Sequence, residues 1–95
     1  MKKLFLISQR KKTGYDTYDS VVVCAENEEE ARLINPGGFY KWHDGAWYFQ
    51  YADGTEEKKS DDTWGNPSDV FVQEIGTADQ SLEIGAVICA SYNAG

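Results

Sequence analysis

Residues 20–38, SVVVCAENEEEARLINPGG, decide the fold of this chain, because they join a strand to a helix with little between them. The valine-rich start favours an extended strand over residues 20–25. Asn27 is a favourable N-cap, and Glu30 stands at the capping-box position three residues later. Pro36 and the two glycines after it end the helix. A helix this short is not stable alone, so the pattern predicts that it docks on a sheet.

Apolar runs on both sides of this stretch supply the remaining strands. Residues 4–8 form a predicted strand before it, and residues 70–75 and 84–92 form two after it. Between them, residues 46–51 and 55–59 flank an Asp-Gly pair that is typical of a β-hairpin turn. The order ββα(ββ)ββ predicts the α+β class, with one short helix packed on a small, mostly antiparallel sheet.

The chain length of 95 residues indicates a single domain over residues 1–95. Residues 39–64 differ from the rest because they are dense in aromatic and charged side chains. We interpret this segment as an aromatic and acidic insertion. The second strand of its hairpin is entirely polar, which predicts that the hairpin is peripheral.

The charges are divided unevenly along the chain. Residues 1–12 carry five bases and no acid (+5), and residues 13–95 carry all sixteen acids against four bases (−12), which together give −7. A body this acidic repels nucleic acid and favours basic protein surfaces, so we expect a protein partner with a basic surface and no direct nucleic-acid binding. No run approaches the ~20 apolar residues of a membrane span, and the apolar start is too short for a secretory signal. We therefore expect a cytoplasmic protein that does not enter a membrane.

Side chains of the catalytic and metal-binding types are few and scattered. Cys24 and Cys89 each lie in an apolar run, which predicts buried, reduced thiols. With the single histidine, His43, they lack the spacing of zinc ligands. His43 stands beside Asp44, but adjacent residues supply neither a nucleophile nor a substrate pocket. The sequence therefore predicts a protein that is not an enzyme and uses no cofactor or metal.

The polar connection between the first two strands holds the first candidate binding site, formed by Tyr15, Asp16, Tyr18 and Asp19. Tyrosine combines an apolar ring with a hydroxyl, which suits recognition surfaces. The two carboxylates can meet an Arg or Lys of a partner. The alternative interpretation is that the acids cap turns and the rings cover the core.

The second candidate site is aromatic and consists of Trp42, Trp47 and Trp64. Exposed rings would make a binding face. The acidic residues around these rings disfavour the binding of a nucleic-acid strand. They disfavour the binding of a small neutral or cationic ligand less. The alternative interpretation is a satellite aromatic core under a long excursion of the chain.

Several stretches together carry a resemblance: KKLFLISQ, GYDTYDSVVV, AENEEEARLINP, WGNPSDVFVQEIG and GAVICASYNAG. They resemble a group of small uncharacterised proteins from tailed phages, prophages and gut-bacterial genomes. The likeness covers both ends of the chain and is weakest in residues 37–62. It implies a bacterial host, and no catalytic residue can be carried over from it. Small accessory phage proteins often bind host proteins, including defence systems.

Two functions follow as hypotheses. The first is a non-enzymatic, phage-type accessory protein that binds and inhibits or modulates a host protein, such as a defence factor or nuclease, through an acidic, aromatic surface. The alternative is a module that binds or sequesters a small ligand or nucleotide. That alternative requires a pocket lined by tryptophan and tyrosine rings, with Arg10, Lys11 or Lys12 at its edge.

Overall fold

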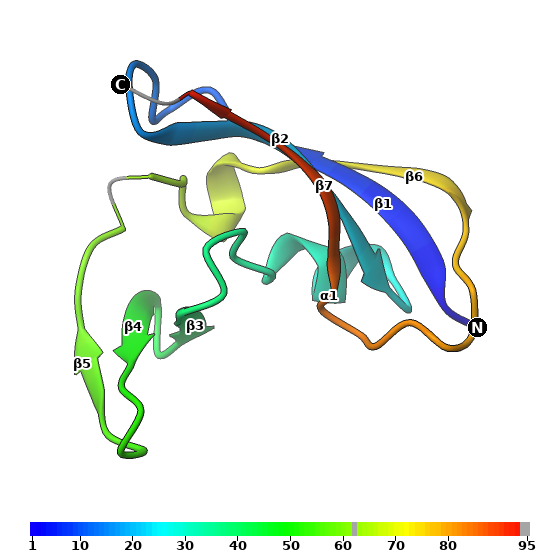
Figure 1. The fold of residues 1–95 in the computed structure, drawn as a ribbon. Helices are drawn as coiled ribbons and strands as arrows, with labels where there is room; N and C mark the ends of the chain where they lie inside the picture. The colour runs from blue at the N-terminus through cyan, green and yellow to red at the C-terminus, as the bar shows by residue number, and fades with distance from the viewer. Residues whose placement is uncertain (62, 94–95) are drawn as a thin grey trace.

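The computed structural model describes residues 1–61 and 63–93, which form two antiparallel sheets, one short α-helix and one 3-10 turn (Figure 1). The larger sheet has the order β6-β1-β2-β7 and the smaller sheet the order β3-β4-β5. The bounds along the chain are β1 Lys3–Ser8, β2 Thr17–Ala25, α1 Glu28–Arg32, β3 Tyr40–His43, β4 Ala46–Gln50, β5 Glu56–Lys58, η1 Pro67–Asp69, β6 Phe71–Thr77 and β7 Val87–Asn93. The predicted α+β class, with one short helix and a mostly antiparallel sheet, is confirmed.

The N-terminus of α1 is capped as the sequence indicates. Asn27 Oδ1 accepts a hydrogen bond from the backbone N–H of Glu30 at 2.8 Å. The Glu30 carboxylate accepts from the backbone N–H of Glu26 at 2.8 Å, one residue before the position expected in a capping box. Two side-chain hydrogen bonds therefore fix the N-terminal turn of this short helix.

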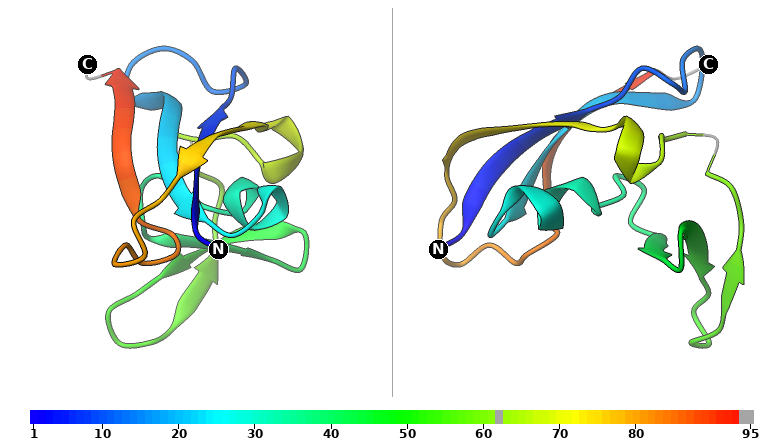
Figure 2. Two further views of the ribbon diagram at one scale, coloured as in Figure 1. Left: turned by 90° about the vertical axis from the view of Figure 1, so that its right-hand side faces the viewer. Right: turned by 180° about the vertical axis from the view of Figure 1, so that it is seen from behind.

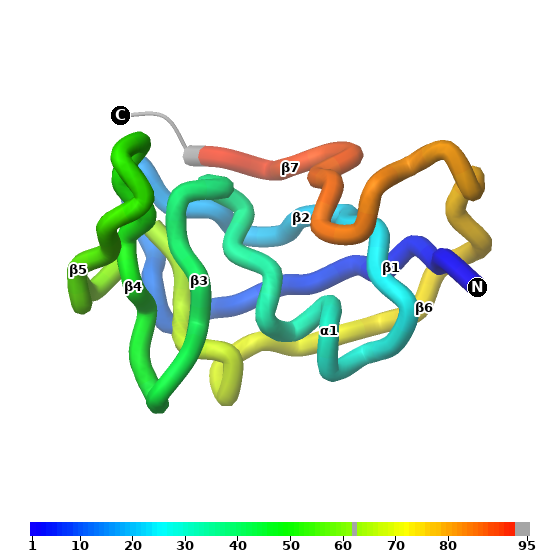
Figure 3. The backbone as a smooth tube through the Cα atoms, turned by 90° about the horizontal axis from the view of Figure 1, so that it is seen from below, coloured from blue at the N-terminus to red at the C-terminus, as the bar shows by residue number. Residues whose placement is uncertain are grey.

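The core lies between the larger sheet and the elements that cover one of its faces. Phe5 and Ile7 from β1 and Val21 and Val23 from β2 are fully buried there, with Ala31 of α1 against them. Figures 1 and 3 show α1 and the smaller sheet on this same side of the larger sheet, and Figure 2 shows the arrangement from two further directions.

The smaller sheet differs from the expected two-stranded hairpin because it contains a third strand, β3. The turn between β3 and β4 is Asp44-Gly45, and both residues have positive φ (52° and 75°), as a tight two-residue hairpin turn requires. The β5 side chains are exposed, as expected for a peripheral strand, whereas Trp47 of β4 belongs to the core. The smaller sheet therefore helps to build the hydrophobic core.

Buried polar contacts connect the smaller sheet to the helix end. Asn35 Nδ2 donates to Asp61 Oδ2 at 2.7 Å, and both residues are 4% exposed. Asp61 Oδ1 accepts from the backbone N–H and the hydroxyl of Thr63, at 2.9 and 2.6 Å. Arg32 of α1 donates to the backbone oxygens of Pro67 and Val70 and so holds η1.

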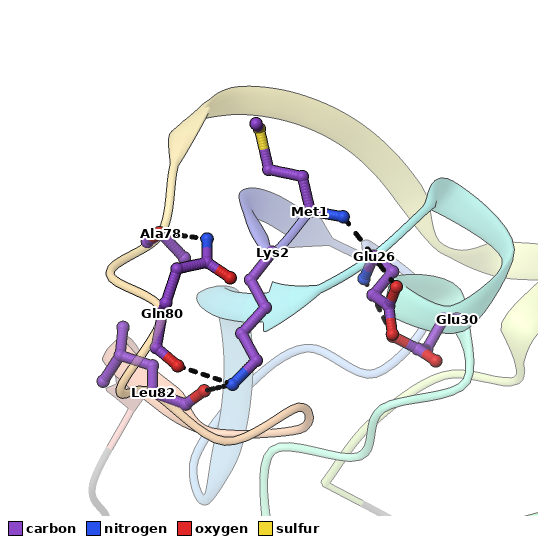
Figure 4. A network of polar contacts seen from close by, with 7 residues as sticks. All are labelled: Met1, Lys2, Glu26, Glu30, Ala78, Gln80 and Leu82. Carbon is purple, nitrogen blue, oxygen red and sulfur yellow. Dashed lines mark hydrogen bonds and ion pairs between the residues drawn. The ribbon is translucent and has the colours of Figure 1, made fainter.

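The connection from β6 to β7 is anchored by Lys2. Its Nζ donates to the backbone oxygens of Gln80 and Leu82 at 2.8 and 2.5 Å (Figure 4). The N–H of Gly85 then bonds to the backbone oxygen of Cys24 at 2.9 Å, at the point where β7 approaches β2. Cys24 is buried and Cys89 is exposed, and both are free thiols, so the expectation of two buried cysteines is wrong for Cys89. It lies on an edge strand that nothing in the described part of the chain covers.

No helix in the described part of the chain is long and apolar enough to span a membrane.

Candidate functional site

An open cleft of about 770 Å³ lies where the loop after β1 faces the smaller sheet. Four lysines line it, two from each side: Lys11 and Lys12 from the loop, and Lys58 and Lys59 from the end of β5. The other lining residues are Trp42, Gly45, Ala46, Trp47, Ser60, Asp61, Asn66 and Asp69.

The cleft is positively charged although the chain is acidic. Its four lysines and two aspartates sum to +2, against −7 for the whole chain. Among the described residues, no carboxylate lies within 4.0 Å of any of these four lysine ammonium groups. Their charges are therefore not neutralised by direct ion pairs within the described chain.

A second cavity of about 380 Å³ adjoins the first, because Lys11 and Asp69 line both. It adds Arg10, Ser68, Val70 and the exposed ring of Phe71. Five of the nine basic residues of the chain thus line one continuous groove. We call the two cavities together the basic groove.

The buried side chain of Gln9 shapes the loop that presents Arg10, Lys11 and Lys12. Its Oε1 accepts from the backbone N–H groups of Lys11 and Lys12 at 2.9 and 2.8 Å. Its Nε2 donates to the backbone oxygens of Lys12 and Tyr18 at 2.8 and 2.7 Å. All four hydrogen-bonding positions of this amide are occupied, so the backbone of the loop that carries the three basic residues is fixed by Gln9.

The aromatic wall of the cleft comes from β3 and β4. Trp42 and Trp47 are cross-strand partners, and their rings meet edge to face at 5.1 Å. Trp47 is 3% exposed and donates from its indole N–H to the backbone oxygen of Gly65 at 3.3 Å. Trp42 is half-buried and packs on the core, so one part of its ring faces the cleft.

The lysines at the end of β5 are placed by contacts to the same sheet. Lys58 lies opposite Tyr48 in the register of β4 and β5. The backbone N–H of Lys59 donates to the oxygen of Trp47 at 3.1 Å, and its ammonium group lies 5.3 Å from the centre of the Phe49 ring. Lys59 is therefore held at the Phe49 ring, on the face of β4 that also carries Trp47, whereas Lys58 lies beside it in sequence on the face that carries Tyr48.

Of the three predicted tryptophans, only Trp42 remains a candidate contact residue. Trp64 is fully buried and Trp47 is nearly so, which makes the interpretation of these two as an exposed binding face wrong. Trp47 of β4 lies in the core cluster with residues of the larger sheet rather than in solvent, whereas Phe49 on the same face of β4 is half-buried.

The predicted Tyr/Asp site is divided by the structure. Tyr15 is 80% exposed and Asp19 is exposed. Asp16, at φ 59°, accepts a hydrogen bond from the hydroxyl of Tyr92 at 3.2 Å. Tyr18 is half-buried, with its ring 4.7 Å from that of Tyr92. Tyr18 and Asp16 thus brace the end of β7, and Tyr15 is left as the exposed ring.

Gln9, Lys58 and Lys59 are the groove residues that the sequence interpretation did not select. The Lys58-Lys59 pair lies in an otherwise acidic segment, and this contrast was the feature of the sequence that could have identified the two lysines as site residues. Gln9 gives no signal, because its role depends on the conformation of the loop that follows it.

A separate cluster on the smaller sheet surrounds His43. Its Nε2 lies 3.0 Å from Glu56 Oε1 and its Nδ1 3.3 Å from Asp44 Oδ2, and its ring stacks on Tyr48 at 3.8 Å. The hydrogen bond to Glu56 raises the pKa of His43, and the bonds from Gln50 and His43 lower the pKa of Glu56. These contacts join β3, the turn after it, β4 and β5 within the smaller sheet. The described residues contain no group of three or more side chains arranged to hold a metal ion.

No protein family, no curated protein and no solved structure matches this chain. The function of the groove therefore has to be argued from its own residues.

Proposed function

We propose that the protein is a non-enzymatic binding module that takes a small anionic ligand of the nucleotide class in the basic groove. The observation that supports this most directly is the set of four lysines in one cleft, with no described carboxylate within 4.0 Å of their ammonium groups. The nucleotide hypothesis asked for tryptophan and tyrosine rings with Arg10, Lys11 or Lys12 at the edge; Lys11 and Lys12 line the cleft together with Trp42, and no tyrosine is among its described lining residues.

The chemistry of the groove fits phosphate at one end and an aromatic ring at the other. Lysine ammonium groups bind phosphate as point charges. The accessible part of Trp42 can stack a base, and such stacking contributes about 1–3 kcal/mol per base. A cleft of about 770 Å³ lies within the size range of small-molecule sites.

The overall charge selects a small ligand over a nucleic-acid strand. A chain of net charge −7 repels an extended polyanion along most of its surface. A nucleotide places all its charge inside the groove and meets only the local positive potential. Binding without turnover fits the position of Asp61, whose carboxylate is engaged by Asn35 and Thr63 and is not free to act as a base.

Thermal denaturation with a panel of nucleoside mono-, di- and triphosphates, and the matching nucleosides, tests the proposal. A ligand at 100 times its dissociation constant adds about 2.7 kcal/mol to stability, which is a rise of about 10 °C or more for a domain of this size. We expect the rise to grow with the number of phosphates and to vanish for the nucleosides. If inorganic triphosphate and nucleotides raised the melting temperature equally, Trp42 would have no role in stacking a base. If no anion raised the melting temperature, the proposal would be overturned.

A second candidate, the binding of a host protein by a phage-type accessory protein in the bacterial cytoplasm, is supported by one observation. Tyr15 is 80% exposed, and the acid Asp19 four residues later is also exposed. An exposed tyrosine ring of this kind can become buried only when a partner protein covers it, and tyrosines are common among the residues that contribute most to binding. The test is capture of a basic protein from lysate at about 0.15 M salt. Weaker capture at about 0.5 M salt, and weaker capture by the Tyr15→Ser variant, would support this candidate. Capture that is unchanged by salt and by this substitution would contradict it.

A further inference from the structure

The second cavity of the basic groove contributes only Lys11 to the nucleotide contacts proposed above, and it shares that residue with the first cavity. The other contacts, Trp42 and three lysines, line the first cavity alone. The second cavity has a volume of about 380 Å³, which lies within the size range of small-molecule sites. A mononucleotide with its base on Trp42 and its phosphates at the lysines of the first cavity therefore leaves this second space unfilled.

The ring of Phe71 is the accessible apolar group in the second cavity. Phe71 is 63% exposed, whereas Val70 before it is 4% exposed. Phe71 begins β6 opposite Ser8, which ends β1, and Arg10 follows Ser8 by two residues. The antiparallel register therefore brings Phe71 and Arg10 to the same end of the larger sheet, where both line the second cavity.

Phe71 and Arg10 supply two flat groups to the second cavity. A phenyl ring and a guanidinium group both stack on the face of a nucleic-acid base. Such stacking tolerates any base, because every base has a π-face. The second cavity therefore offers a base the same kind of contact that Trp42 offers in the first.

A positive charge lies at the junction of the two cavities. Lys11 and Asp69 line both of them. Trp42 lines only the first cavity, and Phe71 lines only the second. Lys11 is thus placed between two rings that can each stack a base.

The walls of this junction are held by contacts within the chain. A Cβ on Gly65 would lie 3.3 Å from Gln9 Oε1 and 3.4 Å from Asp69 Cβ, so the loop after β1 and the turn η1 approach each other closely at this glycine. Arg32 donates to two backbone oxygens, one in η1 and one in the residue after it, and so fixes the turn that carries Asp69. A cavity that is formed in advance loses less conformational entropy when a ligand binds.

The charge of the whole groove suits phosphate groups that lie between two nucleosides. Its five bases and two aspartates sum to +3, although the chain carries −7. Lysine ammonium groups bind phosphate as point charges. A carboxylate accepts hydrogen bonds from hydroxyl groups, so Asp69 at the junction suits a ribose beside the phosphates.

We propose that the ligand of the basic groove is a dinucleotide, in which two nucleosides are joined through phosphate groups. One base stacks on Trp42 and the other on Phe71, and the phosphates between them meet Lys11. This inference rests on the proposed nucleotide function and adds to it a second base, which fills the second cavity.

Isothermal titration calorimetry with matched pairs of ligands tests this inference. Adenosine triphosphate and diadenosine triphosphate have the same number of phosphates, but the dinucleotide carries one more base and one negative charge fewer. A gain in affinity therefore cannot come from charge. We expect the dinucleotide to bind about tenfold more tightly, because a second base is stacked. The corresponding guanosine pair is measured alongside, so that a preference for one base does not hide the effect.

The matched variants Phe71→Ser and Ile75→Ser locate the second base. Both side chains are exposed, at 63 and 48%, on the same strand, but Ile75 is not among the described lining residues of either cavity. We expect Phe71→Ser to bring the affinities of the two ligands in a pair to within about twofold of each other. Ile75→Ser should keep the advantage of the dinucleotide. Phe71→Trp should keep it as well, because it restores a flat ring.

Equal or weaker binding of the dinucleotides would overturn this inference and leave the proposed nucleotide function standing. An advantage that persists in Phe71→Ser would also overturn it, because the second base would then lie elsewhere. If Phe71→Ser alters the circular dichroism, NMR contacts between the second base and the Phe71 ring of the unmodified chain decide, and their absence would overturn the inference. If neither ligand of either pair bound, the proposed function and this inference would fall together.

Discussion

Gln9 and Lys12 bond to each other twice: the Gln9 amide donates to the backbone oxygen of Lys12 at 2.8 Å and accepts from its N–H at 2.8 Å. This reciprocal contact holds the basic segment 10–12 in a tight loop. Replacement of Gln9 by methionine keeps the size of the side chain and removes all four of its hydrogen bonds. We expect the free energy of unfolding to fall by about 2 kcal/mol, because buried polar groups lose their partners. Chemical denaturation measures this, and Gln73→Met on the exposed face of β6 is the control that should have little effect.

Lys58 and Lys41 give a charge-matched test of the groove. Both lie opposite Tyr48, one on β5 and one on β3, but only Lys58 lines the cleft. We expect Lys58→Gln to weaken the binding of a nucleoside triphosphate by about tenfold, the loss of roughly 1.4 kcal/mol for one phosphate contact. Lys41→Gln should leave binding nearly unchanged. Isothermal titration calorimetry compares them, and equal losses in both variants would assign the effect to net charge alone.

Asp61 and Asp79 make the same local contacts in different surroundings. Each accepts from the backbone N–H and the hydroxyl of the residue two positions on, Thr63 or Ser81. Asp61 is buried and also holds Asn35, whereas Asp79 is exposed. We expect Asp61→Ala to lower the free energy of unfolding by about 2–4 kcal/mol, and Asp79→Ala to lower it much less. Similar losses in urea denaturation would show that the contact to Asn35 contributes little.

The His43 cluster predicts a pH effect with a defined sign. The hydrogen bond to Glu56 raises the pKa of His43 above its ordinary value of about 6.5. A raised pKa means that the folded state binds the proton more tightly, so the contribution to stability is complete below pH ~6.5 and is lost as the pH rises through the folded-state pKa. Titration of the His43 ring by NMR should show the raised value. Glu56→Gln should lower it more than Asp44→Asn does, and the reverse order would be inconsistent with the structure.

The three tryptophans differ in their access to solvent. Trp47 and Trp64 are 3 and 0% exposed, and Trp42 is half-buried at the cleft. We expect acrylamide to quench one class of emission readily, and Trp42→Phe to remove that class. A bound nucleotide should protect the same class. Strong quenching that persists in Trp42→Phe would place another ring in solvent and contradict the burial described above.

Local signals in the sequence were sufficient for the helix and for most strands. Asn27 and Glu30 marked the N-terminus of α1, and the valines of β2 marked the strand before it, because capping and β-branching act within a few residues. The strand β3 was missed although Asp44-Gly45 is a strong hairpin signal. Its residues, YKWH, do not alternate cleanly between polar and apolar, so the periodicity gave no support.

The groove could not be derived in the same way, because it depends on contacts between residues distant in the chain. Lys11 and Lys58 are 47 positions apart, and they meet only because the smaller sheet folds back under the larger one. The burial of Trp64 has the same origin. Composition showed that the aromatic rings were numerous, but only the packing of the two sheets decides which of them face solvent.

The division of the groove between two sheets has a consequence for how its selectivity can change. One wall is tied to a buried glutamine, whereas the other ends in a run, residues 51–60, in which every side chain is exposed. Substitutions in that run are therefore expected to leave the folding of the chain intact. If the groove holds the proposed nucleotide, changes at Lys58, Lys59 and Ser60 alone would alter which ligand is preferred, while the buried glutamine keeps the other wall in place.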